Sequence, residues 1–339
     1  VLTKLGVSSQ LSAAALGASV AGLGSVGGRA AGDSSSLPPA QGYEAPLKVY
    51  SLDRAGRRIG VRRFGVGAGK PVLFLHGPSF GAGEYPEDRR LARKYGLDVY
   101  ALERPGYGRT DVVPEDEDAL ACGCLDILAY LDHERLEGVT VLAHEVALIP
   151  ALELAARRPD RVAGILAVSA APPFLELEQI HAIPEHQGIF IHAARHAPWI
   201  AHLLVRLLMI RMRRLGPQGW TAVIFGGLPA ESEVMARPEL LPGVIGTYSF
   251  YLNQMGAGFE HDLQMMLADW SPLLAAAQAP LVLVHGSRNE TTPPGHLELF
   301  RAIRPDVRIE LVENAGLSLA VSHPQLLYRR LASLAEGRK

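Results

Sequence analysis

Glu145 follows a buried apolar run at a point where small residues predict a sharp turn from a strand into a helix. Residues 139–148 read VTVLAHEVAL, and the nucleophile-elbow pattern G-x-S-x-G places Ala143, Glu145 and Ala147 at its three fixed positions. The small residues remain on both sides of the turn, whereas a carboxylate takes the place of the hydroxyl. We therefore expect the architecture of a nucleophile site without the serine that would attack an ester.

Strands and helices that alternate along the chain would position this turn. Apolar runs predict strands at 48–52, 57–64, 71–75, 99–102, 139–143, 163–168, 280–284 and 308–312. Amphipathic stretches predict helices at about 117–131, 148–157, 295–303 and 324–335. Residues 173–262 break the alternation with helical stretches and scattered Pro and Gly, which indicates an inserted helical cap. The rest predicts an α/β fold with a mostly parallel, doubly wound sheet that helices cover on both faces.

Five motifs resemble those of the α/β-hydrolase superfamily and occur in that family's order. His76-Gly77-Pro78 resembles the turn after the third strand that supplies an oxyanion-hole amide. Residues 104–111, RPGYGRTD, resemble the family's D-x-P-G-x-G-x-S loop, and the elbow at Glu145 comes next. Residues 285–293, HGSRNETTP, resemble the turn that carries the catalytic acid, and residues 314–317, NAGL, resemble the turn that carries the histidine. The resemblance implies an α/β-hydrolase-fold domain over residues 43–339.

The three catalytic positions implied by this resemblance hold Glu145, Asn289 and Leu317. A serine triad needs a hydroxyl, an imidazole that takes its proton and a carboxylate that orients the imidazole. None of these groups stands at its place, so we expect no catalytic residues and a degenerate triad. A carboxylate nucleophile, as in the dehalogenases and epoxide hydrolases of this fold, would need a base-activated water that Leu317 cannot supply. Glu290 is one residue out of register for the acid.

Two functions of different classes remain open. In the first, the domain is a sensor that binds a small molecule between cap and sheet without consuming it. The expected ligand-binding residues are Glu145, His76, Gly77, Pro78, His144 and Val146. In the second, the chain is an enzyme of this fold, either a hydrolase or a lyase or isomerase that uses the Glu145 carboxylate. The sensor is our working hypothesis, and we expect no cofactor for either function.

Residues 1–23 resemble a different family, the closing part of a LuxR-type helix-turn-helix domain. The recognition helix of that family ends in a stretch like I-x-x-K-L-G-V-x-S-R, and residues 4–9 read KLGVSS before an Ala-rich segment. The resemblance implies a transcription regulator that contacts DNA only through helices upstream of this chain. Residues 24–42, rich in Gly, Ser and Pro, predict a flexible linker. A weak secretory signal would also fit residues 1–31, although serines and glycines interrupt its apolar core.

Several other side chains have a plain structural interpretation beside a functional one. His192 and His196 stand four residues apart and could share a metal ion, but no third ligand follows at a suitable spacing, so we expect no metal site. The amphipathic stretch 202–216 could touch lipid or a partner, and a lid helix with a solvated basic face is the plainer interpretation. His144 is expected to pack inside the elbow. His323 is expected to start a helix, as a cap or surface group.

Composition narrows the class of protein. The 339 residues carry a net charge of −2, which gives the main body no electrostatic reason to bind nucleic acid. Cys122 and Cys124 are expected to be free, buried thiols of a reducing compartment. No apolar run reaches the roughly 18 residues needed to span a bilayer. We therefore expect a cytoplasmic protein with no membrane partner, and the regulator resemblance suggests a homodimer.

Overall fold

The computed structural model describes residues 47–173 and 185–337; the interpretations of residues 1–23 and 24–42 lie outside this part of the chain. Eight strands form one sheet in the order β1-β2-β4-β3-β5-β6-β7-β8. Their bounds are β1 (Lys48–Ser51), β2 (Arg58–Gly65), β3 (Lys70–Leu75), β4 (Leu97–Leu102), β5 (Val139–His144), β6 (Val162–Val168), β7 (Leu281–Gly286) and β8 (Arg308–Val312). The pairs β1·β2 and β2·β4 are antiparallel and all other neighbours are parallel. The predicted α/β architecture with a mostly parallel sheet is confirmed.

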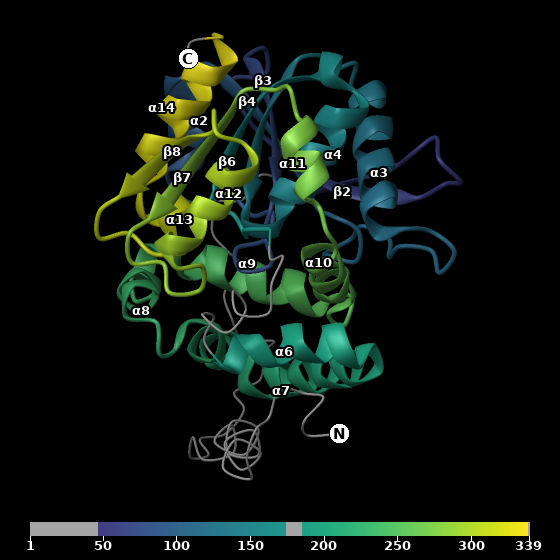
Figure 1. Cartoon of the computed structure of the whole chain (residues 1–339), viewed down its shortest axis with the longest axis vertical. Helices are drawn as coiled ribbons and strands as arrows, with labels where there is room; N and C mark the ends of the chain where they lie inside the picture. Colours follow the sequence, from purple (N-terminus) through teal and green to yellow (C-terminus); the bar gives the residue numbers. More distant parts are fainter. Residues whose placement is uncertain (1–46, 174–184, 338–339) are drawn as a thin grey trace.

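Alternate side chains of the central strands enter two apolar cores, one on each face of the sheet. On β3, Val72 joins one core while Leu73 and Leu75 join the other, as the period of two in a strand requires. The first core lies under α2 (Asp88–Lys94) and α14 (Pro324–Ala335). The second lies under four helices: α3 (Ala119–His133), α4 (Leu148–Arg157), α11 (Ser271–Ala276) and α12 (Leu297–Ile303). Figure 1 shows the sheet between these two helical layers.

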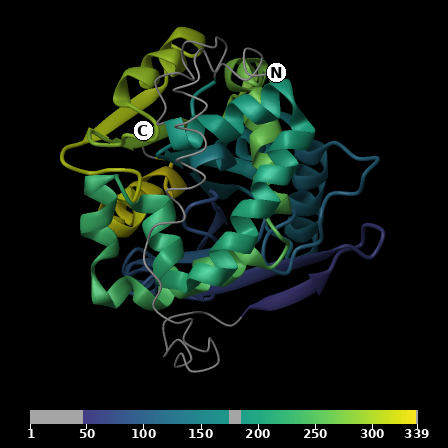
Figure 2. The same cartoon turned by 90° about the horizontal axis from the view of Figure 1, so that it is seen from below.

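A helical cap is inserted between β6 and β7. Its helices are α6 (Glu185–His196), α7 (Pro198–Phe225), α8 (Pro229–Met235), α9 (Leu241–Leu252) and α10 (Ala257–Leu267). The cap lies beyond one end of the sheet, as Figures 1 and 2 show from two directions. Its buried residues, among them Val205, Met209 and Phe250, continue the first core. The cap therefore covers the end of the sheet where β5 runs into its turn.

The predicted elements agree closely with the observed ones. The helices predicted at 148–157 and 324–335 and the strand at 308–312 have the predicted bounds. The seven-residue helix α2 was not predicted, because Asp88–Lys94 is mostly charged and buries only Leu91 and Ala92. The stretch predicted at 202–216 is part of the longer α7, which bends at Gly216, where φ is 69°. No helix among the described residues is long and apolar enough to cross a membrane.

Candidate functional site

The turn after β5 has the strained geometry of a nucleophile elbow. All six residues of β5 are buried, and the next residue, Glu145, has a φ of 54°, in the left-handed region that side chains other than glycine rarely adopt. A single 3₁₀ turn, Glu145–Ala147, leads directly into α4. Ala143 and Ala147 are fully buried beside it. The small residues that the elbow pattern requires thus allow this tight turn, and Glu145 is the residue that the turn presents.

The Glu145 carboxylate folds back against the loop that follows β3. Ser79 Oγ donates a hydrogen bond of 2.9 Å to Glu145 Oε2. A Cβ on Gly77 would lie 2.6 Å from Glu145 Oε1, so only glycine leaves room for the carboxylate at this place. The second oxygen, Oε1, is buried without a hydrogen-bond partner among the described residues. Of the two carboxylate oxygens, Oε2 thus accepts a hydrogen bond and Oε1 accepts none from the described residues.

Burial sets the protonation of this group. Glu145 is 8% exposed. Desolvation raises the pKa of its carboxyl to about 7, the hydrogen bonds from Ser79 lower it, Asp262 raises it and Arg104 lowers it. At neutral pH the carboxyl group is therefore divided between its neutral and charged forms. A group with such a pKa can donate or accept a proton at neutral pH.

The oxyanion hole of a serine hydrolase would have few donors here. Such a hole uses the backbone N–H after the nucleophile, here that of Val146, together with an N–H from the loop after the third strand. Pro78 follows the His-Gly pair in that loop and has no N–H to give. The next residue, Ser79, donates its side-chain hydroxyl to Glu145 Oε2. Glu145 thus binds the side-chain donor of this loop, and Pro78 offers no backbone donor for an oxyanion.

The turn after β8 holds Leu317 where the resemblance implies a histidine. Leu317 is 3% exposed and belongs to the core that the sheet shares with the cap. Its backbone N–H donates to Oε1 of the buried Glu231 over 2.6 Å, and Ser318 N–H donates to Oε2 over 2.9 Å. A Cβ on Gly316 would lie 2.1 Å from the same Oε1. The Glu231 carboxylate of cap helix α8 therefore holds the backbone of the Leu317 turn in place by two hydrogen bonds.

The turn after β7 holds Asn289 in a structural arrangement. Asn289 Oδ1 accepts a 3.0 Å hydrogen bond from the N–H of Thr292, and the side chain is 1% exposed. Its Nδ2 is buried without a partner among the described residues. The N–H of Arg288 donates to Ala315 O over 2.8 Å, so this turn lies against the turn of Leu317. The structure thus brings Asn289 and Leu317 to adjacent turns, with no titratable group at either position.

The two histidines predicted at the site are buried and neutral. His76 Nε2 accepts a 3.0 Å hydrogen bond from the N–H of Arg104, and its Nδ1 lies 2.8 Å from Gly77 O, so Nδ1 carries the proton. Burial and the nearby Arg104 lower the pKa of His76 well below its usual value. Burial lowers the pKa of His144 to about 4, and its ring packs against Phe74 and Phe80. The packing role predicted for His144 agrees with these contacts.

A buried ion pair joins the loop after β4 to the cap. Arg104 comes directly before the Pro-Gly pair of this loop, and Glu103 holds the place of the family's Asp. The guanidinium of Arg104 donates to Asp262 on α10, over 2.8 Å at Nη2. Tyr107 Oη donates to the same carboxylate over 2.7 Å. Arg104 Nε also donates to His76 O over 2.7 Å. The oxyanion loop, the β4 loop and the cap are therefore held together around one guanidinium group.

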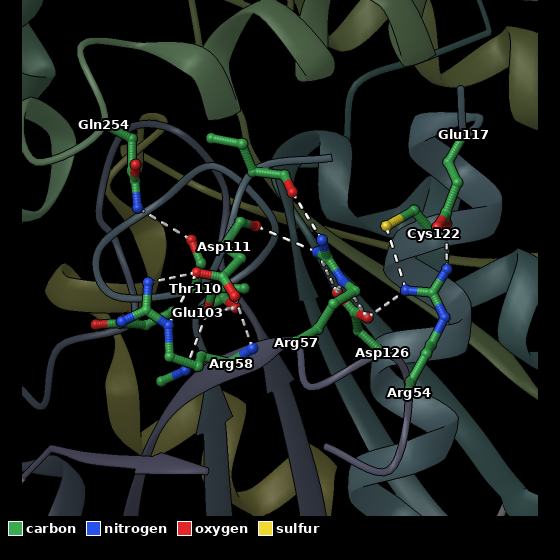
Figure 3. A network of polar contacts seen from close by, with 12 residues as sticks. Arg54, Arg57, Arg58, Glu103, Thr110, Asp111, Glu117, Cys122, Asp126 and Gln254 are labelled. Carbon is green, nitrogen blue, oxygen red and sulfur yellow. Dashed lines mark hydrogen bonds and ion pairs between the residues drawn. The ribbon is translucent and has the colours of Figure 1, made fainter. Parts of the chain in front are cut away.

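A network of polar contacts holds the other side of the β4 loop (Figure 3). Arg57 Nη2 donates to Asp126 on α3 over 2.7 Å. Thr110 Oγ1 donates to Glu103 O over 2.6 Å, and Gln254 Nε2 of the cap donates to Thr110 O over 3.1 Å. A cavity of about 20 Å³, large enough for a water molecule, lies between this network and the Arg104–Asp262 pair. None of the six residues predicted to bind a ligand lines this cavity.

The structure brings several of the predicted ligand-binding residues together. Glu145, Gly77 and the neighbouring Pro78 and His76 meet at one turn. Ser79, Glu231 and Asp262 were not predicted as part of the site. No local sequence pattern marks Glu231 or Asp262, because both lie on cap helices far along the chain from the residues they contact.

Three further histidines and the two cysteines have plain structural surroundings. His192 and His196 stack with their ring centroids 6.5 Å apart, and no group of three metal-binding side chains occurs among the described residues. His323 precedes α14 as predicted, but its side chain makes no cap hydrogen bond; its Nδ1 lies 2.9 Å from Ser322 Oγ instead. Cys122 and Cys124 are free and buried.

Curated relatives match parts of this chain. A protein of Mycobacterium phage D29 named as a non-heme haloperoxidase is 32% identical over 121 residues, which are 34% of this chain and 41% of that relative. The match thus covers less than half of the relative's length. The pimeloyl-[acyl-carrier protein] methyl ester esterase of Aromatoleum aromaticum is 24% identical over 68% of this chain and 84% of its own.

Solved structures share the fold. E-2-(acetamidomethylene)succinate hydrolase superposes with a TM-score of 0.62 at 17% identity, covering 86% of this chain and 100% of its own. The family model described as "Alpha/beta hydrolase family" matches residues 72–330, which include β3, the elbow and the turns of Asn289 and Leu317. This chain therefore belongs to the alpha/beta hydrolase family.

Proposed function

We propose that this chain binds a small molecule beside Glu145 and does not hydrolyse it through a serine triad. The observation that carries the proposal is the turn of Leu317, where the family's base would lie. An aliphatic side chain is buried there and Glu231 fixes the backbone. Because this turn offers no imidazole to activate a hydroxyl or a water, we expect no turnover by the triad mechanism.

Unpartnered polar atoms support a binding role. Glu145 Oε1, Asn289 Nδ2 and Ser318 Oγ are buried at the three catalytic turns and have no hydrogen-bond partner among the described residues. Buried polar groups in folded proteins are almost always satisfied, so such a group is a place where a ligand or water binds. A ligand whose hydroxyl, amide or amine reaches Glu145 Oε1 would donate the hydrogen bond that this carboxylate oxygen lacks.

The regulator hypothesis extends this proposal. Residues 4–9, KLGVSS, resemble the end of a LuxR-type recognition helix, and a domain that binds without hydrolysis would serve such a regulator as its sensor. This resemblance and the altered catalytic positions are its support. The test is the reading frame upstream of Val1: it should continue without a stop codon and encode the first helices of a helix-turn-helix domain. A start codon close to Val1 would contradict the regulator.

An enzyme is the second candidate, and two observations favour it. The pKa of Glu145, about 7, suits a group that moves a proton at neutral pH. The relatives found are named as a haloperoxidase and an esterase. In this version Glu145 would take a proton from one carbon of a bound substrate and return it to another, as in an isomerase. Because no base that could activate a water accompanies it at the turn of Leu317, a covalent ester on Glu145 is not part of this candidate.

One experiment distinguishes the two candidates. A library of small metabolites is screened for a rise in melting temperature of the wild-type chain and of Glu145→Gln, and every ligand found is followed by mass spectrometry. The binding proposal expects ligands that stabilise the wild type, lose most of their effect in Glu145→Gln, and are recovered unchanged. Conversion of a ligand by the wild type but not by Glu145→Gln would establish the enzyme instead.

A further inference from the structure

The outer face of helix α7 carries a continuous row of exposed apolar side chains. Trp199 is 71% exposed, Leu203 and Leu207 are each 50% exposed, and Ile210 is 43% exposed. The intervals of four, four and three residues place these side chains on one side of the helix. Figure 1 shows α7 on the outer side of the cap, away from the sheet.

This row is the exception on the described surface. Five of the eleven large hydrophobic residues exposed in the described ranges lie on α7, and the other six are scattered over separate strands, helices and loops. Single exposed apolar residues are normal, whereas a contiguous apolar patch marks an interaction surface. The opposite side of α7 accounts for the fold, because Ala201, Val205, Met209 and Met212 are buried against the rest of the cap.

The same exposed face carries positive charge and no negative charge of its own. Arg206, Arg213 and Arg214 are exposed on α7, and the helix contains no Asp or Glu between residues 198 and 225. Glu260 on α10 lies beside the helix, with its Oε2 2.9 Å from His202 Nδ1. The sequence led us to expect a solvated basic face, and the structure shows instead that apolar and basic side chains share this face.

The charge pattern distinguishes between two partners that could cover this face, a second copy of the chain and an anionic lipid surface. In a dimer of two α7 faces the same surface would meet itself, and the exposed arginines of α7 would find no carboxylate on the partner's α7. An anionic lipid surface supplies negative charge at every position and an apolar layer just beneath it. Tryptophan is enriched at such interfaces because its ring is apolar and its N–H is polar.

We propose that α7 is a peripheral membrane-binding helix that lies in the surface of an anionic bilayer. The first part of the helix, before the bend at Gly216, would insert Trp199, Leu203, Leu207 and Ile210 among the acyl chains near the headgroups. The arginines on the same face would contact phosphate groups. The sequence had led us to expect no membrane partner, and the exposed row is the observation that changes this expectation.

The test is sedimentation of the full chain with vesicles. Vesicles of phosphatidylcholine with one-third phosphatidylglycerol are expected to bind the chain, and vesicles of phosphatidylcholine alone are expected to bind it far more weakly. The triple variant R206Q/R213Q/R214Q should bind the anionic vesicles roughly 10- to 100-fold more weakly. The variant L203S/L207S should also lose binding, whereas L241S/L311S, which changes two exposed leucines on other elements, should not.

Circular dichroism of each variant shows whether it is folded, and light scattering follows its oligomeric state. Absence of binding to both kinds of vesicle would overturn the proposal. A dimer of the wild type that L203S/L207S dissociates, without vesicle binding, would assign the face to a second copy and would also overturn it. Undiminished binding by the arginine variant would overturn the choice of an anionic membrane, because that choice depends on the charge argument.

Discussion

The loop after β4 and the elbow after β5 lie close together, and they treat buried polar groups in opposite ways. In the loop, Arg104 and Tyr107 both donate hydrogen bonds to the carboxylate of Asp262, and Thr110 makes hydrogen bonds to Glu103 and Gln254. At the elbow, Glu145 Oε1 and both nitrogens of His144 are buried without a partner among the described residues. In the loop these buried polar groups have hydrogen-bond partners within the protein, whereas at the elbow these buried polar atoms are left without one. Protein sites commonly combine such a rigid support with groups that only a ligand completes.

The largest expected effect comes from breaking the scaffold. Arg104→Met removes the partner of the buried Asp262 and should lower the free energy of unfolding by about 3–5 kcal/mol, because a lone buried charge remains. The further change Asp262→Leu should recover part of this loss. Arg58→Gln breaks an exposed ion pair with Asp111 and serves as the control with little effect. Denaturant unfolding of the four proteins measures these changes, and equal effects of Arg104→Met and Arg58→Gln would contradict the assigned role.

Replacing the buried carboxyl group of Glu145 should have the next largest effect on the free energy of unfolding, and this effect should depend on pH. The folded-state pKa of Glu145 is raised from 4.5 to about 7, so the neutral form is favoured in the fold. This contribution to stability is complete below about pH 4.5 and is lost as pH rises to about 7, by up to about 3 kcal/mol. Glu145→Gln should remove this loss and be more stable than the wild type at about pH 8. Parallel pH profiles of the two proteins would show that Glu145 does not titrate in this range.

The smallest of these effects tests how tightly the carboxylate is held. A Cβ at position 77 would lie 2.6 Å from Glu145 Oε1 and 2.8 Å from Glu145 Cβ, so Gly77→Ala should lower the free energy of unfolding by about 1–3 kcal/mol. Glu145→Gly removes both contacts and suits the positive φ of the elbow. The double variant should therefore show little of the Gly77→Ala penalty. A penalty of the same size in both backgrounds would place the clash elsewhere.

The sequence predicted the fold well because the sheet and its turns are local patterns. The apolar run of 139–143 and the small residues Ala143 and Ala147 were sufficient to predict the sharp turn of the elbow. The structure adds the left-handed backbone of Glu145, with a φ of 54°. The partners of the site were not predictable in the same way. Glu231 and Asp262 come from cap helices far along the chain, and their contacts depend on how the cap is placed over the sheet.

The exposed face of α7 shows the same limit. The period of 202–216 predicted an amphipathic helix, and the buried Val205 and Met209 confirm which side is inside. The pattern did not indicate that Leu203 and Leu207 would remain exposed, because leucines at these positions are equally suited to a second layer of packing. Whether such a residue meets protein or solvent is decided by tertiary contacts that periodicity does not contain.

The most direct test of the proposed function is the hydrolysis of p-nitrophenyl acetate by the wild-type chain and by Glu145→Gln and Glu145→Ser, measured at neutral pH. The proposal predicts no turnover above the buffer rate for any of the three, because a serine at position 145 would still face Leu317 and Asn289 instead of a base and its acid. Turnover by the wild type that Glu145→Gln abolishes would contradict the proposal and establish Glu145 as a catalytic carboxylate.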